Sequence, residues 1–343
     1  MAKLKLPKDS REKFKSARDF IQARDVESAR SRLLEVELGS SFSLFHRLMA
    51  ACAYIDNDFE LACSHIEQAI ALDPDKQVLI ADAIRIYRTQ GDDKRAKDLL
   101  ESFNLEKTQT SSELMRIAQA YKSYQCYQDA ATALENALRL SPDNVQARNL
   151  YGIILCCLNR DEEALQQWKF SLRYQPNEIV TKVCLGRLYL HQQEYLKSID
   201  FFKQTLDDDG DNMTGRRLNL AEAHVRASSL SEARSLLGEI DDAETNPRYH
   251  YIWTLLHIAA NDHFLAFASL NRCISLGQEH GHPALVKIDW PGEYQDDDAA
   301  SKAIASALPI LNSIFDALSM LKSLNRQKLY QSDELTEFNS DII

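Results

Sequence analysis

Along most of the chain, apolar residues recur at intervals of three and four residues, and small residues return about every 34 residues. Intervals of three and four are the period of an amphipathic α-helix. A fixed return over a few tens of residues is typical of a helical repeat, in which each short unit packs against the next. The pattern therefore predicts antiparallel helix pairs stacked one after another along the chain.

The second helix of each predicted pair carries a small residue at a position where close helix crossing leaves no room for a larger one. Five copies keep an unbroken register up to residue 212, the phase then slips by one residue, and the first and last copies are less regular. Pro74, Pro142 and Pro176 follow second helices, as expected where a helix ends. The small residues are Ala29, Ala62, Ala96, Ala130, Ala164, Ser198, Ala233 and Ala266. The predicted repeats are 10–42, 43–76, 77–110, 111–144, 145–178, 179–213, 214–246 and 247–280.

The copies that begin at Ser111, Val145 and Ile179 resemble the tetratricopeptide repeat. These three copies match its pattern W-x2-L-G-x2-Y…A-x3-F…P most fully, although the first Trp is absent and is replaced by Leu114, Arg148 and Lys182. The resemblance implies an all-α, right-handed superhelical solenoid of about eight repeats, with a concave face lined mainly by the first helix of each pair. It specifies an architecture and leaves the partner open.

Composition and charge narrow the class of protein. The chain has a net charge of -11, with 45% hydrophobic and 27% charged residues. A soluble globular protein fits this balance, and a general nucleic-acid binder does not, because phosphate contacts need a basic surface. The basic segment 1–9 lacks the apolar run of a secretory signal, so we expect a cytoplasmic protein. The seven cysteines include no CxxC pair and fall within predicted helices, which favours reduced core residues.

The periodicity ends near His280, and three further parts are predicted after it. They are a connector at 281–298, an amphipathic helix at 299–330 and a flexible acidic tail at 331–343. Leu311, Phe315 and Leu318 lie on the apolar stripe of this helix. We expect the helix to cap the last repeat, with pairing in a homo-oligomer or with a partner helix as the alternative. Polar residues within the helix argue against a membrane span.

Sequence signs of chemistry are missing. The chain has no G-x-S-x-G, no Gly-rich phosphate loop and no H-E-x-x-H, so we predict no catalytic residue, no enzyme activity and no cofactor. His280 and His282 flank Gly281, and His263 is the third histidine considered with them, but no carboxylate or thiol stands at ligand spacing, so we predict no metal site.

A partner-binding groove is the better candidate. Helical phase places a polar and mildly basic set of first-helix residues on the concave face, which would favour another protein or an acidic peptide segment. The set is Arg47, Arg85, Arg88, Gln119, Lys122, Asn149, Arg187 and Tyr251.

Tetratricopeptide co-chaperones that bind the carboxylate end of heat-shock chaperones use a particular set of Lys, Asn and Arg on three first helices. Here Asn219 matches the residue on the middle helix. The preceding first helix has Arg187 and the following one has Arg248, and neither helix carries the residue set of the clamp, so no such clamp is predicted. The sequence predicts a non-enzymatic scaffold or adaptor. An assembly chaperone, a regulatory subunit of a separately encoded enzyme and a self-assembling structural protein stay open as alternatives.

Overall fold

The computed structural model describes residues 8–37, 39–108, 110–206, 213–240 and 243–279 of the 343-residue chain. Regular structure within these ranges consists of sixteen α-helices and three short 3-10 helices, at Gly39–Ser41, Leu105–Lys107 and Ala243–Thr245. The chain divides into two compact units, and the division falls within one helix, between Gln167 and Trp168. We call the described residues 8–167 unit 1 and 168–279 unit 2.

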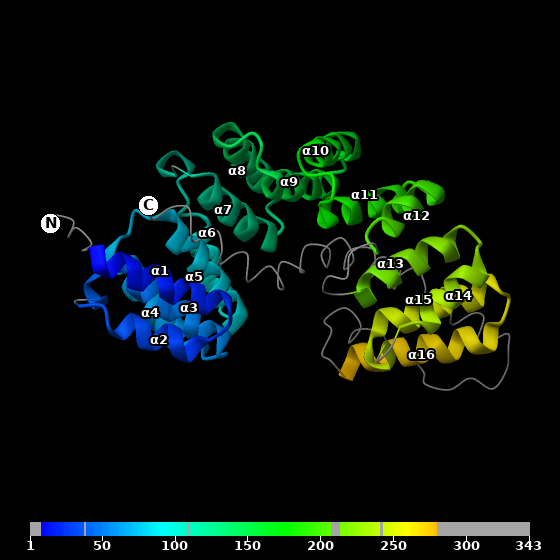
Figure 1. Ribbon diagram of the computed structural model, residues 1–343, viewed down its shortest axis with the longest axis horizontal. Coiled ribbons are helices and arrows are strands. Elements are labelled where there is room, and N and C mark those ends of the chain that lie inside the picture. The colour runs from blue at the N-terminus through cyan, green and yellow to red at the C-terminus, as the bar shows by residue number, and fades with distance from the viewer. Residues whose placement is uncertain (1–7, 38, 109, 207–212, 241–242, 280–343) are drawn as a thin grey trace. The chain divides into compact units, whose positions relative to one another are not determined.

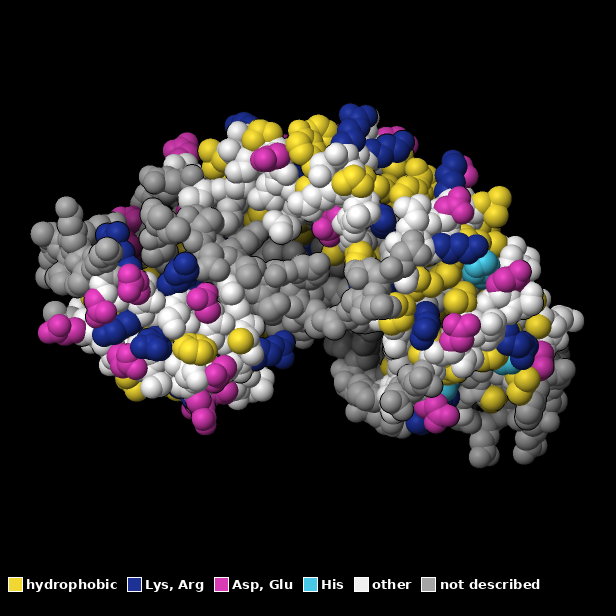
Figure 2. Space-filling view, in the orientation of Figure 1, with side chains coloured by type: hydrophobic (Ala, Val, Ile, Leu, Met, Phe, Trp, Pro, Cys, Tyr) yellow, Lys and Arg dark blue, Asp and Glu magenta, His cyan; other side chains and the backbone are white. Residues whose placement is uncertain are grey.

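Unit 1 is built from consecutive antiparallel helix pairs, in which the first helix of a pair packs against the second (Figure 1). Figure 2 shows acidic and basic side chains interspersed over its first two helices, where Lys13 pairs with Asp9 at 2.8 Å. Its helices are α1 (Lys8–Gln22), α2 (Val26–Leu34), α3 (Ser43–Ile55), α4 (Phe59–Leu72), α5 (Gln77–Gln90), α6 (Asp93–Leu100), α7 (Ser111–Ser123), α8 (Tyr127–Leu140), α9 (Val145–Cys157) and the first part of α10 (Asp161–Tyr174).

Unit 2 repeats the same arrangement with three further pairs. Its core holds the two largest fully buried side chains of the described chain, Trp168 and Tyr251, together with Phe202. Its helices are the end of α10, then α11 (Ile179–His191), α12 (Tyr195–Lys203), α13 (Met213–Arg226), α14 (Leu230–Gly238), α15 (Pro247–Ala259) and α16 (His263–Glu279).

The helix starts show the repeat period directly. From α3 onward the first helix of each pair begins 34 residues after the previous one, at Ser43, Gln77, Ser111, Val145, Ile179, Met213 and Pro247. The all-α repeat fold predicted from the sequence is therefore confirmed. The structure also locates the one-residue phase slip seen in the sequence. Helix α13 still begins at the 34-residue spacing, α14 begins one residue late, and α15 returns to the spacing.

The turn between the two helices of each pair is built in the same way throughout. In each of the eight pairs one residue adopts positive φ, between 57° and 90°, and only one of the eight is glycine, Gly91. The small residue of the second helix follows five positions later in every pair, and all eight small residues are fully buried. In the pair where the phase slips, the turn residue Ser228 and the small residue Ala233 are both shifted by one position, so the distance between them is unchanged.

Two local features fix the second helices in place. Asp25, Asp58, Asp92 and Asp262 each precede a second helix, and their carboxylates accept a hydrogen bond at 3.1 Å from the backbone N–H three residues later. Such a cap satisfies an N–H group that the helix itself leaves without a partner. In unit 2, Ser198 Oγ donates a hydrogen bond of 2.8 Å to the carbonyl of Gly186, which joins the second helix of this pair to its first.

The predicted connector, the amphipathic helix at 299–330 and the acidic tail lie outside the described residues, as do Leu311, Phe315, Leu318, His280 and His282. The right-handed superhelix stays a prediction.

Candidate protein-binding surface

The first helices of unit 1 are joined by a buried carboxylate between two arginines. Asp82 on α5 accepts a hydrogen bond from Arg47 Nε on α3 at its Oδ2, and one from Arg116 Nη1 on α7 at its Oδ1, both at 2.7 Å. The three side chains are only 7–8% exposed. One acidic residue thus connects the first helices of three consecutive repeats.

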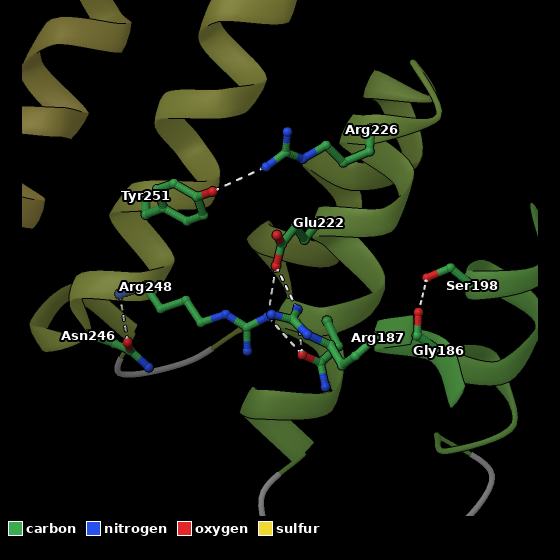
Figure 3. Close-up of polar contacts among 9 residues, drawn as sticks. Gly186, Arg187, Ser198, Glu222, Arg226, Asn246, Arg248 and Tyr251 are labelled. Atoms are coloured by element: carbon green, nitrogen blue, oxygen red, sulfur yellow. Dashed lines mark hydrogen bonds and ion pairs between the residues drawn. The ribbon is translucent and has the colours of Figure 1, made fainter. Parts of the chain in front are cut away.

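Unit 2 carries a second arrangement of this kind, shown in Figure 3. Glu222 Oε2 on α13 accepts from Arg187 Nη1 on α11 and from Arg248 Nη2 on α15, each at 2.9 Å. Asn219, one helical turn before Glu222, accepts from the same two guanidinium groups at 3.5 Å and 2.7 Å. We call Arg47–Asp82–Arg116 and Arg187–Glu222–Arg248 the two arginine–carboxylate triads.

Electrostatics keep both carboxylates ionised. Burial alone would raise the pKa of Asp82, but Arg47, Arg116 and Arg85 together outweigh it and hold the pKa at about 2. The pKa of Glu222 is likewise held at about 2, because Arg187, Arg248 and Arg226 outweigh the effect of burial. On the basic side, burial lowers the pKa of Arg47 to about 10, and burial followed by repulsion from Arg187 lowers the pKa of Arg248. Asp82, Glu222 and Arg47 are therefore charged at neutral pH.

We define the first-helix surface of each unit as the side of its first helices that carries the triad. Of the predicted groove residues, Arg47 and Arg187 are triad members. Asn149 on α9 is also buried, whereas Gln119 and Lys122 on α7 are half-buried.

The remaining two predicted arginines of unit 1 lie against aromatic rings of the adjacent repeats. The Arg85 guanidinium is 4.8 Å from the centre of the Tyr54 ring, and that of Arg88 is 6.0 Å from the Tyr124 ring. Arg88 is exposed and Arg85 half-buried. These two residues are therefore available at the surface while also contacting the neighbouring repeats.

The prediction that Tyr251 faces a binding groove is wrong. Tyr251 is 0% exposed and belongs to the apolar core of unit 2, with Leu218, Leu255 and Leu270. Its hydroxyl accepts a hydrogen bond of 3.3 Å from Arg226 Nη2. Helical phase alone could not distinguish the core-facing side of α15 from its outer side, because α15 is apolar on several sides.

Sequence reasoning missed the carboxylate partners of the triads. Asp82 lies 35 residues after Arg47 and 34 before Arg116, and Glu222 lies 35 after Arg187, so opposite charges stand at nearly the same repeat position in adjacent first helices. A search for such charge pairs at the repeat period would have found them. The structure also brings together Arg187, Asn219 and Arg248, the three residues that were compared with the co-chaperone clamp in the sequence.

Two observations concern metal sites and membrane-spanning helices. Among the described residues, no group of three or more His, Cys, Asp or Glu side chains is placed to hold a metal ion. Within the same ranges, no helix is long and apolar enough to cross a membrane.

Consecutive helix pairs at a period of 34 residues define the chain as a helical-repeat protein. Residues 116–168 match the family model for the tetratricopeptide repeat. A tetratricopeptide repeat protein from Parabacteroides merdae has the same fold with a TM-score of 0.56 and 15% identity, over 71% of this chain and 97% of that one. The Cut9–Hcn1 hetero-tetramer of the APC/C contains a chain with a TM-score of 0.52 and 13% identity, over 76% of this chain and 48% of that one.

Among curated proteins, an Arabidopsis thaliana protein named N-terminal acetyltransferase A complex auxiliary subunit NAA15 is 28% identical over 158 residues. The match covers 45% of this chain and 16% of the length of that relative.

Proposed function

We propose that this protein is a non-enzymatic scaffold or adaptor that binds a partner protein along its first-helix surface. The observation that carries the proposal is the pair of arginine–carboxylate triads on the first helices, where Asp82 and Glu222 each lie between arginines of the adjacent repeats. Repeat proteins of this class present extended, preformed surfaces on which a partner makes many small contacts. The ion pairs between first helices keep that surface rigid before a partner arrives.

The experiment is quantitative affinity capture from native extract with the full chain and two charge-reversal variants. One variant carries Arg85→Glu and Arg88→Glu on the first-helix surface. Its matched control carries Lys97→Glu and Arg139→Glu, two exposed residues of the second helices α6 and α8. We expect the first variant to lose bound protein and the control to retain it. Equal retention by both variants would contradict a first-helix binding surface.

A regulatory subunit of a separately encoded enzyme is the second candidate, favoured by the similarity to an auxiliary subunit of an acetyltransferase complex. This version predicts one captured protein in fixed stoichiometry, with an enzymatic activity that changes when the chain is added back. An assembly chaperone would instead release its captured protein once that protein has been incorporated into a complex.

A further inference from the structure

The triad of unit 2 holds more positive than negative charge. Two guanidinium groups, those of Arg187 and Arg248, share the single carboxylate of Glu222. The three side chains are 4%, 9% and 2% exposed, so water screens the imbalance poorly. Buried charge without compensation is costly, and an anion that joined the cluster would relieve this cost.

The geometry of the arginines suits one kind of anion. Both guanidinium groups donate to one oxygen, Glu222 Oε2, and the Nε of Arg248 is buried without a hydrogen-bond partner among the described residues. Two arginines that converge on one carboxylate oxygen, with a further donor left over, suit a second carboxylate. The contact that an incoming acidic side chain would make is thus already made by Glu222.

Unit 1 repeats this chemistry independently. Asp82 is held between Arg47 and Arg116 at 2.7 Å, with the charge of Arg85 also acting on it. Arginines therefore outnumber carboxylates in both triads, although the chain as a whole has a net charge of -11. A long polyanion such as a nucleic acid would be repelled by that net charge, whereas a short acidic protein segment would feel mainly the local cluster.

We propose that Arg187 and Arg248 form a binding site for an acidic side chain of a partner protein, and that Glu222 occupies this site as an internal competitor in the unbound protein. The inference rests on the proposed scaffold function and adds the chemistry of the partner. The partner's acidic side chain replaces or joins Glu222 at the guanidinium pair. Because it must compete with Glu222, the internal carboxylate determines how acidic a partner segment must be. Asp82 has the corresponding role between Arg47 and Arg116.

The test removes the negative charge of Glu222 and keeps the shape of its side chain. Glu222→Gln retains an acceptor oxygen but no charge, and Glu232→Gln is the matched control because Glu232 is an exposed glutamate of the same unit. The probe is a fluorescein-labelled heptaglutamate peptide with an amidated carboxyl end, with heptaglutamine as its neutral counterpart. Binding is measured with the full chain by fluorescence anisotropy.

We expect E222Q to bind heptaglutamate about tenfold more tightly than the unaltered chain does, since anion affinity rises when a competing carboxylate leaves a buried cation pair. E232Q should change this affinity less than twofold, and adding Arg248→Gln to E222Q should abolish the gain. Equal affinities for E222Q and E232Q would overturn the proposal, as would a gain for heptaglutamine of the same size.

If E222Q does not fold alone, refolding it with either peptide becomes the test. Recovery of helical circular dichroism with heptaglutamate but not heptaglutamine supports the proposal, and failure with both overturns it. The scaffold function is judged separately, because capture by the Arg85→Glu, Arg88→Glu variant leaves the unit 2 triad intact. Suppose that E232Q and E222Q both capture the partner normally while E222Q gains no affinity for the peptide. This result would be consistent with the scaffold function and would overturn the proposed acidic-side-chain site.

Discussion

The turn residue of positive φ gives the clearest expectation for a single residue. Gly91 has φ of 90°, and a Cβ added there would meet no atom within 4 Å, so a substitution acts through the backbone alone. Gly91→Ala should lower the free energy of unfolding by about 1 kcal/mol, because left-handed backbone is unfavourable for residues with a Cβ. Urea unfolding followed by circular dichroism measures this.

Gly238→Ala is the control for Gly91→Ala. Gly238 ends α14, has equally open surroundings and lacks the positive φ, so alanine there should be neutral or slightly stabilising. If both alanine variants lost the same stability, the left-handed turn would not be the cause.

Close helix crossing makes a second prediction, at Gly186. A Cβ there would lie 2.5 Å from Cε1 of Phe202, a fully buried ring. Gly186→Ala should therefore cost about 1–3 kcal/mol through overpacking. Ser198→Ala in the same helix pair should cost less, about 1 kcal/mol for a lost hydrogen bond, because alanine is the usual residue at this repeat position. Thermal unfolding of both variants decides whether the order holds.

At this scale the sequence predicted the small residues well and the turn residues not at all. Alanine at a fixed period identifies a close crossing, and each predicted position is fully buried. Positive φ has no such signal, since Arg24, Gln125 and Gln193 are ordinary residues whose conformation is imposed by the packing of the two helices around the turn.

Among the elements, the triads connect first helices that are far apart in sequence, so removing one carboxylate should weaken a whole unit. Asp82→Asn removes the buried carboxylate charge that both Arg47 and Arg116 contact, and should cost about 3 kcal/mol at pH 7. We expect denaturant unfolding of the variant to begin at lower concentration than in the unaltered chain.

The same carboxylate predicts a dependence on pH. The pKa of Asp82 is lowered to about 2 from its ordinary 3.8, so its stabilising effect is complete above pH 4 and is lost as pH falls toward 2. The stability difference between the unaltered chain and Asp82→Asn should shrink over that range. A difference that stays constant from pH 7 to pH 2 would show that Asp82 does not act through its charge.

Helix pairs and their period were predictable because each helix has an apolar face and each copy repeats it. Contacts between repeats were harder to predict, because an arginine on a polar helix face looks solvent-exposed until its partner on the next helix is known. Arg47 and Arg187 were expected at a surface and are found in buried ion pairs. The expectation failed where charge pairing between repeats competed with exposure to water.

For the molecule as a whole, the two units should respond to acid in ways that fluorescence can separate. Both described tryptophans, Trp168 and Trp253, lie in unit 2, where burial lowers the pKa of His224, His250 and His257. Because these histidines are favoured in the neutral form by folding, unit 2 is most stable above their ordinary pKa of 6.5 and loses stability as pH falls below it.

The melting midpoint followed by tryptophan fluorescence should therefore decrease from pH 7.5 to pH 5. A variant with glutamine at all three histidine positions should show a smaller decrease. An unaltered chain whose fluorescence midpoint is the same at both pH values would contradict this prediction.

The fold class of the whole molecule followed from periodicity, but periodicity carries no information about which polar face receives a partner. The most direct measurement is site-specific photo-cross-linking in native extract, with benzoylphenylalanine placed either at Gln119 on the first helix α7 or at Arg139 on the second helix α8. A first-helix binding surface predicts a cross-linked partner protein from position 119 and none from position 139. Cross-links from position 139 alone would contradict it and place binding on the second helices.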